Sequence, residues 1–272
     1  MSLIEMDFRQ IKPFRLSANY DEKIPSEYSW GKYHHSHKGC EIYVNLTGDV
    51  SFMVESTIYP ISSGDVIITR PYESHHCIFH SNELHRHYCV NFSSNGNEEL
   101  LDLFYNRKSG EKNLLIFSEK NKTALFSLLQ SIIFNPTDSL EQYLHFFQLL
   151  TLINGSTAKK SLNIHIRPEI ATAIDYIDRS LKSQISISIS ELAQNACMSL
   201  NTFERNFKMC VGMSPRDYIR QKRLDKASLL LVKGHSVHEA CMQCGFSDYS
   251  QFISLFKKQF GKTPLQYKKS AK

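Results

Sequence analysis

Histidines gather in the first third of the chain, where eight of the twelve lie between His34 and His87. Within this stretch His35 and His37 stand two residues apart, and Glu41 follows four residues later. Residues two apart on a β-strand face the same side, and position 41 keeps the same parity. Imidazole nitrogens combined with a carboxylate are ligands that suit Fe, Ni, Mn or Zn. The spacing therefore indicates a candidate site for a divalent metal.

The residues around this motif form short runs of the kind that build an antiparallel sheet. β-branched and aromatic residues dominate the runs, and turn residues such as Gly48 and Gly64 separate them. The runs cover 41–46, 51–55, 57–61, 66–69 and 88–92. Short strands at this spacing are typical of a barrel or a sandwich, which we expect over residues 1–97.

Helical periodicity replaces the strand pattern after Asn97. Apolar residues recur at three- and four-residue steps over 122–134 and again over 138–154. The second segment is apolar on more than one face, so it needs a second partner surface. Either it is enclosed within one chain or one side pairs with another subunit. We favour a homodimer formed by a helical segment at 98–154. Small, polar and charged residues predict a linker at 155–166.

The charge of the chain divides at about the same place. Residues 1–160 carry 15 Lys and Arg against 18 Asp and Glu, a formal charge of −3, whereas residues 161–272 carry 17 against 9, a charge of +8. This asymmetry indicates that the C-terminal part binds a polyanion, nucleic acid first of all. Seven scattered cysteines favour reduced thiols over a disulfide framework. With no long apolar run and no visible secretory signal, we expect a cytoplasmic protein without a membrane partner.

The basic C-terminal part contains an internal repeat. Each unit predicts a short helix, a tight turn, and a longer helix that is N-capped by a serine, Ser199 or Ser247, and ended by a glycine. A helix, a short turn and a second helix make a helix-turn-helix. The repeat therefore predicts two such units in an all-α domain over 167–272. At an offset of 49 residues, Phe207, Gly212, Pro215 and Tyr218 match Phe256, Gly261, Pro264 and Tyr267.

The longer helix of each unit separates apolar from polar residues. In the first, predicted over 200–210, Phe203 and Phe207 share one face and should point into the core. Arginine suits guanine, asparagine suits adenine and lysine reaches phosphate, so the opposite face is predicted to contact DNA. We expect more base readout from the first helix, because Ser254 stands where the first helix has Arg205. The candidate DNA-binding residues are Asn201, Thr202, Glu204, Arg205, Lys208, Tyr249, Ser250, Gln251, Ser254 and Lys257.

Residues 168–269 resemble the DNA-binding domain of the AraC family of bacterial transcription regulators. The resemblance rests on the sequence SELAQNACMS at 190–199, on Gly212-x2-Pro215, and on CGFSD at 244–248 with the phenylalanines that follow. It implies two helix-turn-helix units that are joined by a central helix at about 215–232 and enter successive segments of the major groove. It also implies RNA polymerase as a partner.

The histidine motif, continued to Gly48, is similar to the first motif of the cupin family. Gly64-Asp65 and Pro71-x4-His76 are similar to the second motif, which implies that His76 joins His35, His37 and Glu41 as a metal ligand. Sensor domains of the AraC family resemble cupins too, and there such residues hold an organic effector or are satisfied within the fold. Polar groups interleaved with aromatic rings suit a sugar. The candidate effector-binding residues are His35, His37, Glu41, Tyr43, His76 and Tyr88.

Together these features predict a multidomain β + α protein. An N-terminal cupin-like β-barrel with following helices precedes a C-terminal all-α domain with two helix-turn-helix units. We expect a ligand-responsive, sequence-specific regulator of transcription, an activator of a carbohydrate or small-metabolite operon, that binds double-stranded DNA and a small-molecule effector and is not an enzyme. The one candidate cofactor is a divalent metal in the cupin pocket. The alternative function is a metal-dependent cupin enzyme or metal sensor fused to a DNA-binding module.

Overall fold

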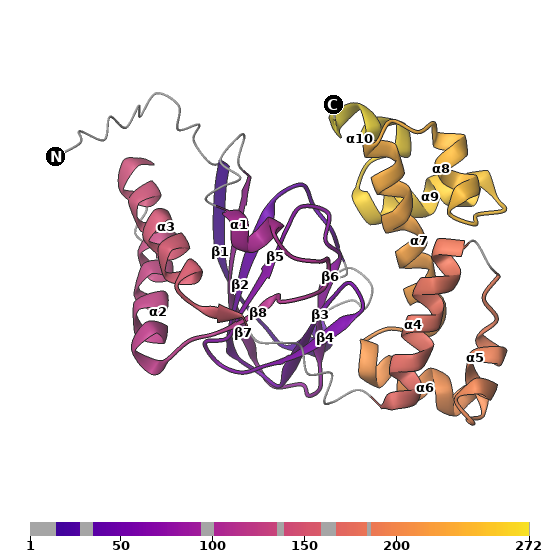
Figure 1. Ribbon diagram of the computed structural model, residues 1–272, viewed down its shortest axis with the longest axis horizontal. Helices are drawn as coiled ribbons and strands as arrows, with labels where there is room; N and C mark the ends of the chain where they lie inside the picture. The colour runs from indigo at the N-terminus through magenta and orange to yellow at the C-terminus, as the bar shows by residue number, and fades with distance from the viewer. Residues whose placement is uncertain are drawn as a thin grey trace.

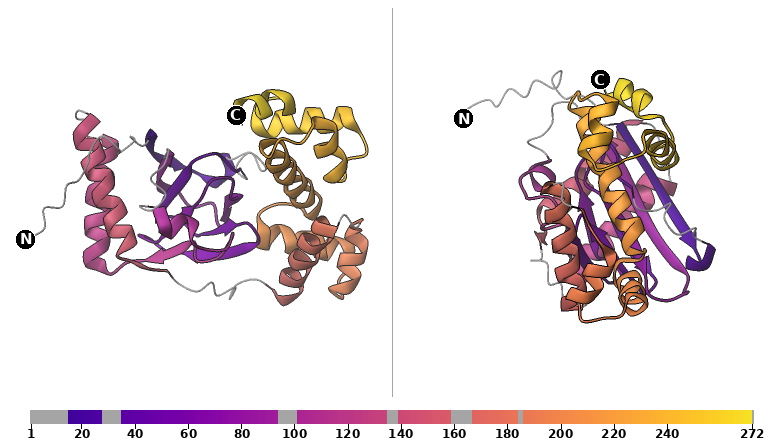
Figure 2. Two further views of the ribbon diagram at one scale, coloured as in Figure 1. Left: turned by 45° about the horizontal axis from the view of Figure 1, so that its top comes forward. Right: turned by 90° about the vertical axis from the view of Figure 1, so that its right-hand side faces the viewer.

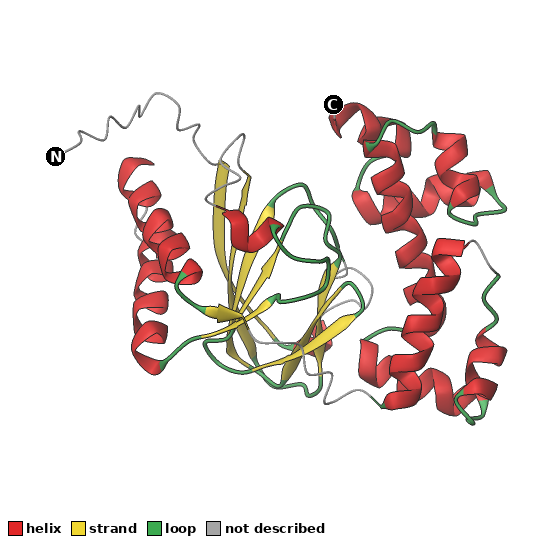
Figure 3. Ribbon diagram, in the orientation of Figure 1, coloured by secondary structure: helices red, strands yellow, loops and turns green. Residues whose placement is uncertain are grey.

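The computed structural model describes residues 15–27, 35–93, 101–134, 139–158, 167–183 and 186–271. Strands dominate the N-terminal domain and helices make up the C-terminal domain (Figure 3). This arrangement confirms the predicted β + α fold class.

The strands in the described part of the chain form two sheets. The larger sheet has the order β1-β7-β2-β5-β8-β9 and the smaller sheet has the order β4-β3-β6. The sheets pack face to face through an apolar cluster that includes Tyr43 and Ile67 from the larger sheet and Phe52 and Tyr59 from the smaller. The strands are β1 (Arg15–Lys23), β2 (Cys40–Thr47), β3 (Val50–Val54), β4 (Thr57–Ile61), β5 (Val66–Thr69), β6 (His75–Phe79), β7 (His85–Ser93), β8 (Leu114–Ile116) and β9 (Thr157–Ala158).

The predicted barrel needs three corrections. The strand pairings among the described residues make two sheets rather than a closed barrel. His35 and His37 do not lie on a strand, because His35 forms only an isolated bridge with His75. Finally, β8 and β9 pair into the larger sheet, so that sheet extends beyond the predicted boundary at residue 97. These pairings join residues far apart in the sequence, and short-range patterns do not report them.

Helices cover the outer face of the larger sheet (Figure 1). They are the short α1 (Asp102–Tyr105), α2 (Glu119–Phe134) and α3 (Ser139–Asn154). Phe146 of α3 packs edge-on against Phe92 of β7, with 4.9 Å between ring centroids. The apolar faces of α2 and α3 thereby form the domain core with the sheet. β9 lies within the predicted linker at 155–166, whose residues 159–166 are outside the described residues.

The C-terminal domain consists of two helix-turn-helix units joined by one long helix. The helices are α4 (Pro168–Ser183), α5 (Ile189–Asn195), α6 (Leu200–Val211), α7 (Pro215–Val232), α8 (Val237–Gln243), α9 (Tyr249–Phe260) and α10 (Pro264–Ala271). The central helix α7 has the predicted bounds and contributes Tyr218 to the first core and Leu224 to the second. The two units lie at opposite ends of α7 (Figure 1).

The ends of the two longer helices follow their local chemistry. Gly212 ends α6 at φ 82° and Gly261 ends α9 at φ 70°, a left-handed conformation that glycine adopts without a steric cost. Ser199 caps α6 as predicted, by accepting a hydrogen bond from the Thr202 N–H. The predicted cap Ser247 is wrong, since Asp248 accepts the equivalent bond from the Gln251 N–H.

The smaller sheet packs against the C-terminal domain, on the side opposite α2 and α3 (Figures 1 and 2). Met53, Ile58 and Ile78 of this sheet belong to the same buried apolar cluster as Phe207 and Val211 of α6. The two domains therefore share a core. None of the helices within the described ranges is long and apolar enough to span a bilayer.

Candidate functional site

A cavity of about 170 Å³ lies between the two sheets. Its walls come from β1, β2 and β7 of the larger sheet and from β3 and β6 of the smaller. The rings of Phe52 and Phe79 contribute apolar surface. A cavity of about 150 Å³ accommodates benzene, so this one suits a small molecule. The polar side chains that line it include Asp21, Glu41, Tyr43, His85, His87 and Asn91.

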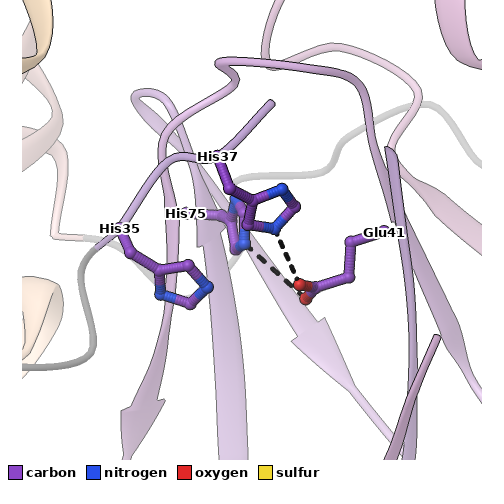
Figure 4. Close-up of side chains that lie close together, drawn as sticks. All are labelled: His35, His37, Glu41 and His75. Carbon is purple, nitrogen blue, oxygen red and sulfur yellow. Dashed lines mark hydrogen bonds and ion pairs between the residues drawn. The ribbon is translucent and has the colours of Figure 1, made fainter. Parts of the chain in front are cut away.

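Three imidazoles and one carboxylate meet beside this cavity (Figure 4). One donor atom from each of His35, His37, Glu41 and His75 lies within 4.8 Å of the others. His37 Nε2 is 3.0 Å from Glu41 Oε2, and His75 Nε2 is 3.6 Å from Glu41 Oε1. Glu41 comes from β2 and His75 from β6, so the cluster joins the two sheets.

Backbone carbonyls orient two of these imidazoles. His37 Nδ1 donates to the Gly39 carbonyl at 3.0 Å, and His75 Nδ1 donates to the Glu73 carbonyl at 2.7 Å. In each ring the Nε2 atom is therefore turned toward Glu41. Histidines that bind metals are held in this way, with the second ring nitrogen donating to a carbonyl or carboxylate. The donor set and its orientation fit a divalent transition metal.

Glu73 is itself fixed by an enclosed ion pair. Its Oε2 lies 2.5 Å from Arg107 Nη2, and the two side chains are 0% and 2% exposed. It also accepts hydrogen bonds from the backbone N–H of Gly110 at 2.7 Å and from Asn113 Nδ2 at 3.1 Å. Burial raises the pKa of Glu73, but Arg107 and the backbone N–H groups of Gly110 and Arg70 lower it by more. The carbonyl that orients His75 thus belongs to a rigid, ionised residue.

The Glu41 carboxylate and the imidazoles around it shift each other's pKa values in opposite directions. Burial raises the pKa of Glu41, but the nearby imidazoles of His75, His37 and His35 hold it well below its usual range. Burial lowers the pKa of His75, and the Glu41 carboxylate reverses that effect and raises it. A buried carboxylate at this position needs a positive partner, which is either a protonated imidazole or a cation.

The pKa of His87 is shifted downward, in contrast to that of His75. Burial and the neighbouring His85 lower its pKa to about 4, so its ring is neutral at pH 7. Burial likewise lowers the pKa of His85. His85 Nε2 lies 2.9 Å from the Tyr43 hydroxyl, and its Nδ1 donates to the Thr47 carbonyl at 3.0 Å. This wall of the cavity therefore offers neutral hydrogen-bonding groups.

Two of the predicted effector or metal residues lie outside the histidine cluster. His76, predicted as the further metal ligand, is replaced in the cluster by His75. Successive residues of β6 face opposite sides of the sheet, and the His76 imidazole donates from Nε2 to the Val211 carbonyl at 2.8 Å. His76 touches the cavity only as part of its wall. Tyr88, also predicted, packs on the other face of β7 against Tyr20, in the core beneath α2.

Sequence reasoning missed the contribution of β7. His85, His87, Cys89 and Asn91 all line the cavity from this strand. Their recurrence at every second position is the signal that indicates a polar interior face. Residues 19 and 21 of β1 join them because β1 pairs with β7 over its whole length.

The residues predicted to contact DNA lie on the outer faces of α6 and α9. In α6 the two phenylalanines are buried, whereas Asn201, Arg205 and Lys208 are exposed and Thr202 and Glu204 are half-buried. In α9 the pair Phe252 and Phe256 is buried. The exposed residues of α9 are Tyr249, Ser250, Gln251, Ser254 and Lys257. The N-terminal domain leaves both outer faces open to solvent.

Comparison with known protein families assigns both halves of the chain. Residues 24–132 match the model of the AraC-like ligand binding domain, and residues 192–270 match that of a helix-turn-helix domain. The chain belongs to the AraC family. This confirms the resemblance in the C-terminal part and gives the N-terminal domain of this AraC-family protein its class, a domain that binds ligands.

Two similar proteins are named as transcription regulators. The protein named "Probable transcriptional regulator LumQ" of Photobacterium leiognathi is 32% identical over 94 residues, which are 34% of this chain and 37% of LumQ. The HTH-type transcriptional activator RhaS of Escherichia coli strain SE11 is 30% identical over 122 residues, 44% of this chain and 42% of RhaS. The chain therefore spans less than half the length of these relatives.

Solved structures include similar proteins as well. The DNA-binding domain of AdpA in complex with a target DNA is 28% identical, and the match covers 38% of this chain and 93% of that one with a TM-score of 0.34. ToxT from Vibrio cholerae O395 is 15% identical, and the match covers 96% of this chain and 100% of that one with a TM-score of 0.38.

Proposed function

We propose that this AraC-family protein is an effector-responsive, sequence-specific regulator of transcription, with activation as its mode. The observation that carries the proposal is the pair of exposed polar faces on α6 and α9. The domain that contains these helices shares an apolar core with the smaller sheet, which forms one wall of the cavity. RhaS, one of its relatives, is named as an activator. As an activator in the cytoplasm, this protein would contact RNA polymerase.

The length of α7 supports binding to successive segments of the major groove. Its 18 residues span about 27 Å at 1.5 Å per residue. Adjacent major-groove segments on one side of the duplex lie about 34 Å apart. A helix of this length, with α6 packed at one end and α9 at the other, is of the same order as that repeat.

The test is the selection of duplexes from a random library, followed by affinity measurements on the selected and a scrambled sequence. We expect at least about 10³-fold preference for the selected duplex at physiological salt. We also expect both affinities to fall as salt rises, because lysines displace counterions from phosphate. Equal affinity for selected and scrambled duplexes would overturn the proposal.

For the effector we propose a small uncharged polar molecule, a sugar in the first place. Among the described residues that line the cavity there is no Lys or Arg, so an anion lacks a counter-charge. Asn91 and the neutral rings of His85 and His87 suit hydroxyl groups, and Phe52 suits the apolar face of a sugar ring. A thermal-shift panel of monosaccharides and matched sugar acids tests this. Stabilisation by the acids alone would contradict it.

A second candidate function follows from the cluster of His35, His37, Glu41 and His75. We propose that it binds a divalent transition metal, which makes the protein a metal sensor or a cupin enzyme fused to a DNA-binding module. The orientation of two Nε2 atoms by backbone carbonyls supports this. Equilibrium dialysis with Zn²⁺, Ni²⁺, Mn²⁺ and Fe²⁺ should give one ion per chain, and His37→Ala or His75→Ala should abolish binding. Unchanged loading of these variants would contradict it.

We propose that the protein is a homodimer that pairs through α2 and α3. Although the inner faces of these helices pack on the sheet, Phe134, Leu140 and Leu144 are 55%, 67% and 55% exposed. Large apolar side chains gathered on one surface mark an interaction site. Sedimentation equilibrium tests the proposal, and a monomer at micromolar concentration would overturn it.

A further inference from the structure

Ser74, just before β6, and His75 and His76, its first two residues, connect the histidine cluster with the C-terminal domain. Ser74 Oγ donates to Asp225 Oδ2 of α7 at 2.9 Å. His75 faces the other way, into the cluster with Glu41. His76 faces outward again and donates to the Val211 carbonyl of α6 at 2.8 Å. The alternation of side chains along an extended chain thus places one residue in the cluster and its two neighbours on the DNA-binding domain.

The contacts of Ser74 and His76 are made to α7 and to the end of α6, the elements that determine where α6 and α9 lie. Val211 is the last residue of α6, and Gly212 ends that helix. A Cβ built on Gly212 would lie 3.5 Å from Ile78 Cγ1 and 3.8 Å from His76 Nε2, so β6 is in close contact with this helix end. Asp225 lies in the middle of α7, the helix that joins the two units. A shift of β6 therefore acts on the position of α6 relative to α7.

Ser74 is tied to α7 by a second route. The carboxylate of Glu55 accepts the Ser74 backbone N–H at Oε1, 3.0 Å away, and pairs at Oε2 with Lys222 Nζ, also at 3.0 Å. Lys222 and Asp225 are one turn apart on α7. The backbone and the side chain of Ser74 thus both connect to the same helix.

The surroundings of these contacts are tightly packed. Ser74, His75 and His76 are 1%, 1% and 4% exposed. Met53, which pairs with His76 across β3 and β6, is fully buried in the core that the domains share. Close-packed interiors transmit displacements because they contain little free volume to absorb them. Movement of His75 therefore carries Ser74 and His76 with it.

Metal loading would contract the cluster to which His75 belongs. Donor atoms that share one ion at about 2.1 Å are at most about 4.2 Å apart. The four donor atoms of the cluster spread over 4.8 Å, so loading draws them together. His75 is the member of the cluster that lies on β6, whereas Glu41 is anchored in the larger sheet.

We propose that a divalent transition metal bound by His35, His37, Glu41 and His75 controls DNA binding through Ser74 and His76. The inference rests on the proposed regulator function and on the metal as its signal. Ser74 and His76 are positioning residues: they contact neither the metal nor the DNA, and they transmit the state of the cluster to α7 and α6.

The experiment measures the affinity of full-length protein for its selected duplex, with the protein stripped of metal and with Zn²⁺ or Ni²⁺ added. We expect the wild type to change its Kd at least tenfold. His76→Leu should bind metal with unchanged stoichiometry and change its Kd less than twofold. Ser74→Ala is a milder second variant that should reduce the response. His80→Leu is the matched control, because the His80 imidazole bonds to Ser51 of β3, within the N-terminal domain, and it should respond like the wild type.

Hydrogen exchange provides a readout that does not depend on DNA. In the wild type, metal should change the exchange rate of the Gly212 amide, which donates to the Lys208 carbonyl at the end of α6, and His76→Leu should remove that change. Absence of metal binding, metal binding without an effect on exchange or affinity, or equal responses in wild type and His76→Leu would each overturn the inference. Failure of the proposed function gives a different result, which is no discrimination between duplexes with or without metal.

Discussion

Lys222 of α7 and Glu55 of the β3–β4 turn form an ion pair between the two domains, with 3.0 Å between Nζ and Oε2. Asp178 of α4 lies 3.9 Å from the same ammonium. Burial lowers the pKa of Lys222, but Tyr218 and the two carboxylates raise it by more, so the ammonium stays charged. Glu55 has φ 54°, an uncommon conformation for a residue with a side chain. The residue with this conformation is the one whose carboxylate contacts α7.

Replacement of Lys222 should weaken the packing between the two domains and lower the free energy of unfolding. Lys222→Met leaves the Glu55 and Asp178 carboxylates without their cation, and we expect a loss of about 1–3 kcal/mol in the free energy of unfolding. The loss is below the range for a fully buried pair because Glu55 is 29% exposed. Urea unfolding measures it. Arg179→Met is the control, since its pair with Asp175 is 68% and 65% exposed and should be worth under about 0.5 kcal/mol. Equal losses in both variants would contradict a role for the interdomain pair.

Arg205→Ala should weaken binding to the selected duplex by about 1–3 kcal/mol and leave binding to random DNA nearly unchanged, because base contacts supply specificity. Lys208→Ala is the comparison: a phosphate contact should weaken binding to both duplexes and lower the salt slope by about 1. Fluorescence anisotropy at several salt concentrations gives both quantities. Equal losses on both duplexes for Arg205→Ala would assign it to the backbone instead.

Leu144→Asp should convert the dimer to a monomer, because it places a charge in the surface proposed to pair. Leu144 is 55% exposed, so the change costs the monomer little. Leu265→Asp on α10 is the matched control, at 54% exposure but far from α3 in the sequence. Sedimentation equilibrium at several concentrations decides the outcome. Dissociation of both variants, or of neither, would argue against α3 as the interface.

Glu73→Gln should destabilise the N-terminal domain and disturb the histidine cluster. It leaves Arg107 buried without its counter-ion, which costs about 3–5 kcal/mol. Because the Glu73 carbonyl orients His75, metal affinity should fall as well. Urea unfolding and metal titration measure the two effects. Glu22→Gln is the control, since its pair with Arg86 is 41% exposed on both sides and should have little effect.

Acid should destabilise the protein through His87. Its pKa is about 4 in the folded protein and about 6.5 when unfolded, so the unfolded chain binds the proton more tightly. Stability is therefore full above pH 6.5 and falls as the pH decreases toward 4. At pH 5 the loss should be at most about 2 kcal/mol relative to pH 7.5. Urea unfolding at both pH values should show a smaller loss in His87→Gln; the same loss in both proteins would assign the effect to other groups.

Local chemistry was enough to predict the DNA-binding domain. Gly212 ends α6 and Pro215 begins α7. The pair Phe203 and Phe207, at positions i and i+4, turns one face of α6 toward the core. Each of these signals acts within one or two helical turns. The repeated pattern predicted both helix-turn-helix units, and the resemblance to the AraC family supplied the bounds of α7. Only the cap of α9 differed, because Ser247 and Asp248 are both good caps and the backbone conformation selects between them.

The sequence by itself thus determined the class of each domain, the positive charge that favours DNA as a partner of one of them, and the residue types of the histidine cluster. Tertiary structure decided which of two adjacent histidines joins that cluster, since a shift of one residue along β6 reverses the face on which a side chain lies. It also decided that β1 and β7 line the cavity and that His76 contacts α6. These relationships depend on strands and helices that are distant in the chain, and their free energy comes from packing that no local pattern records.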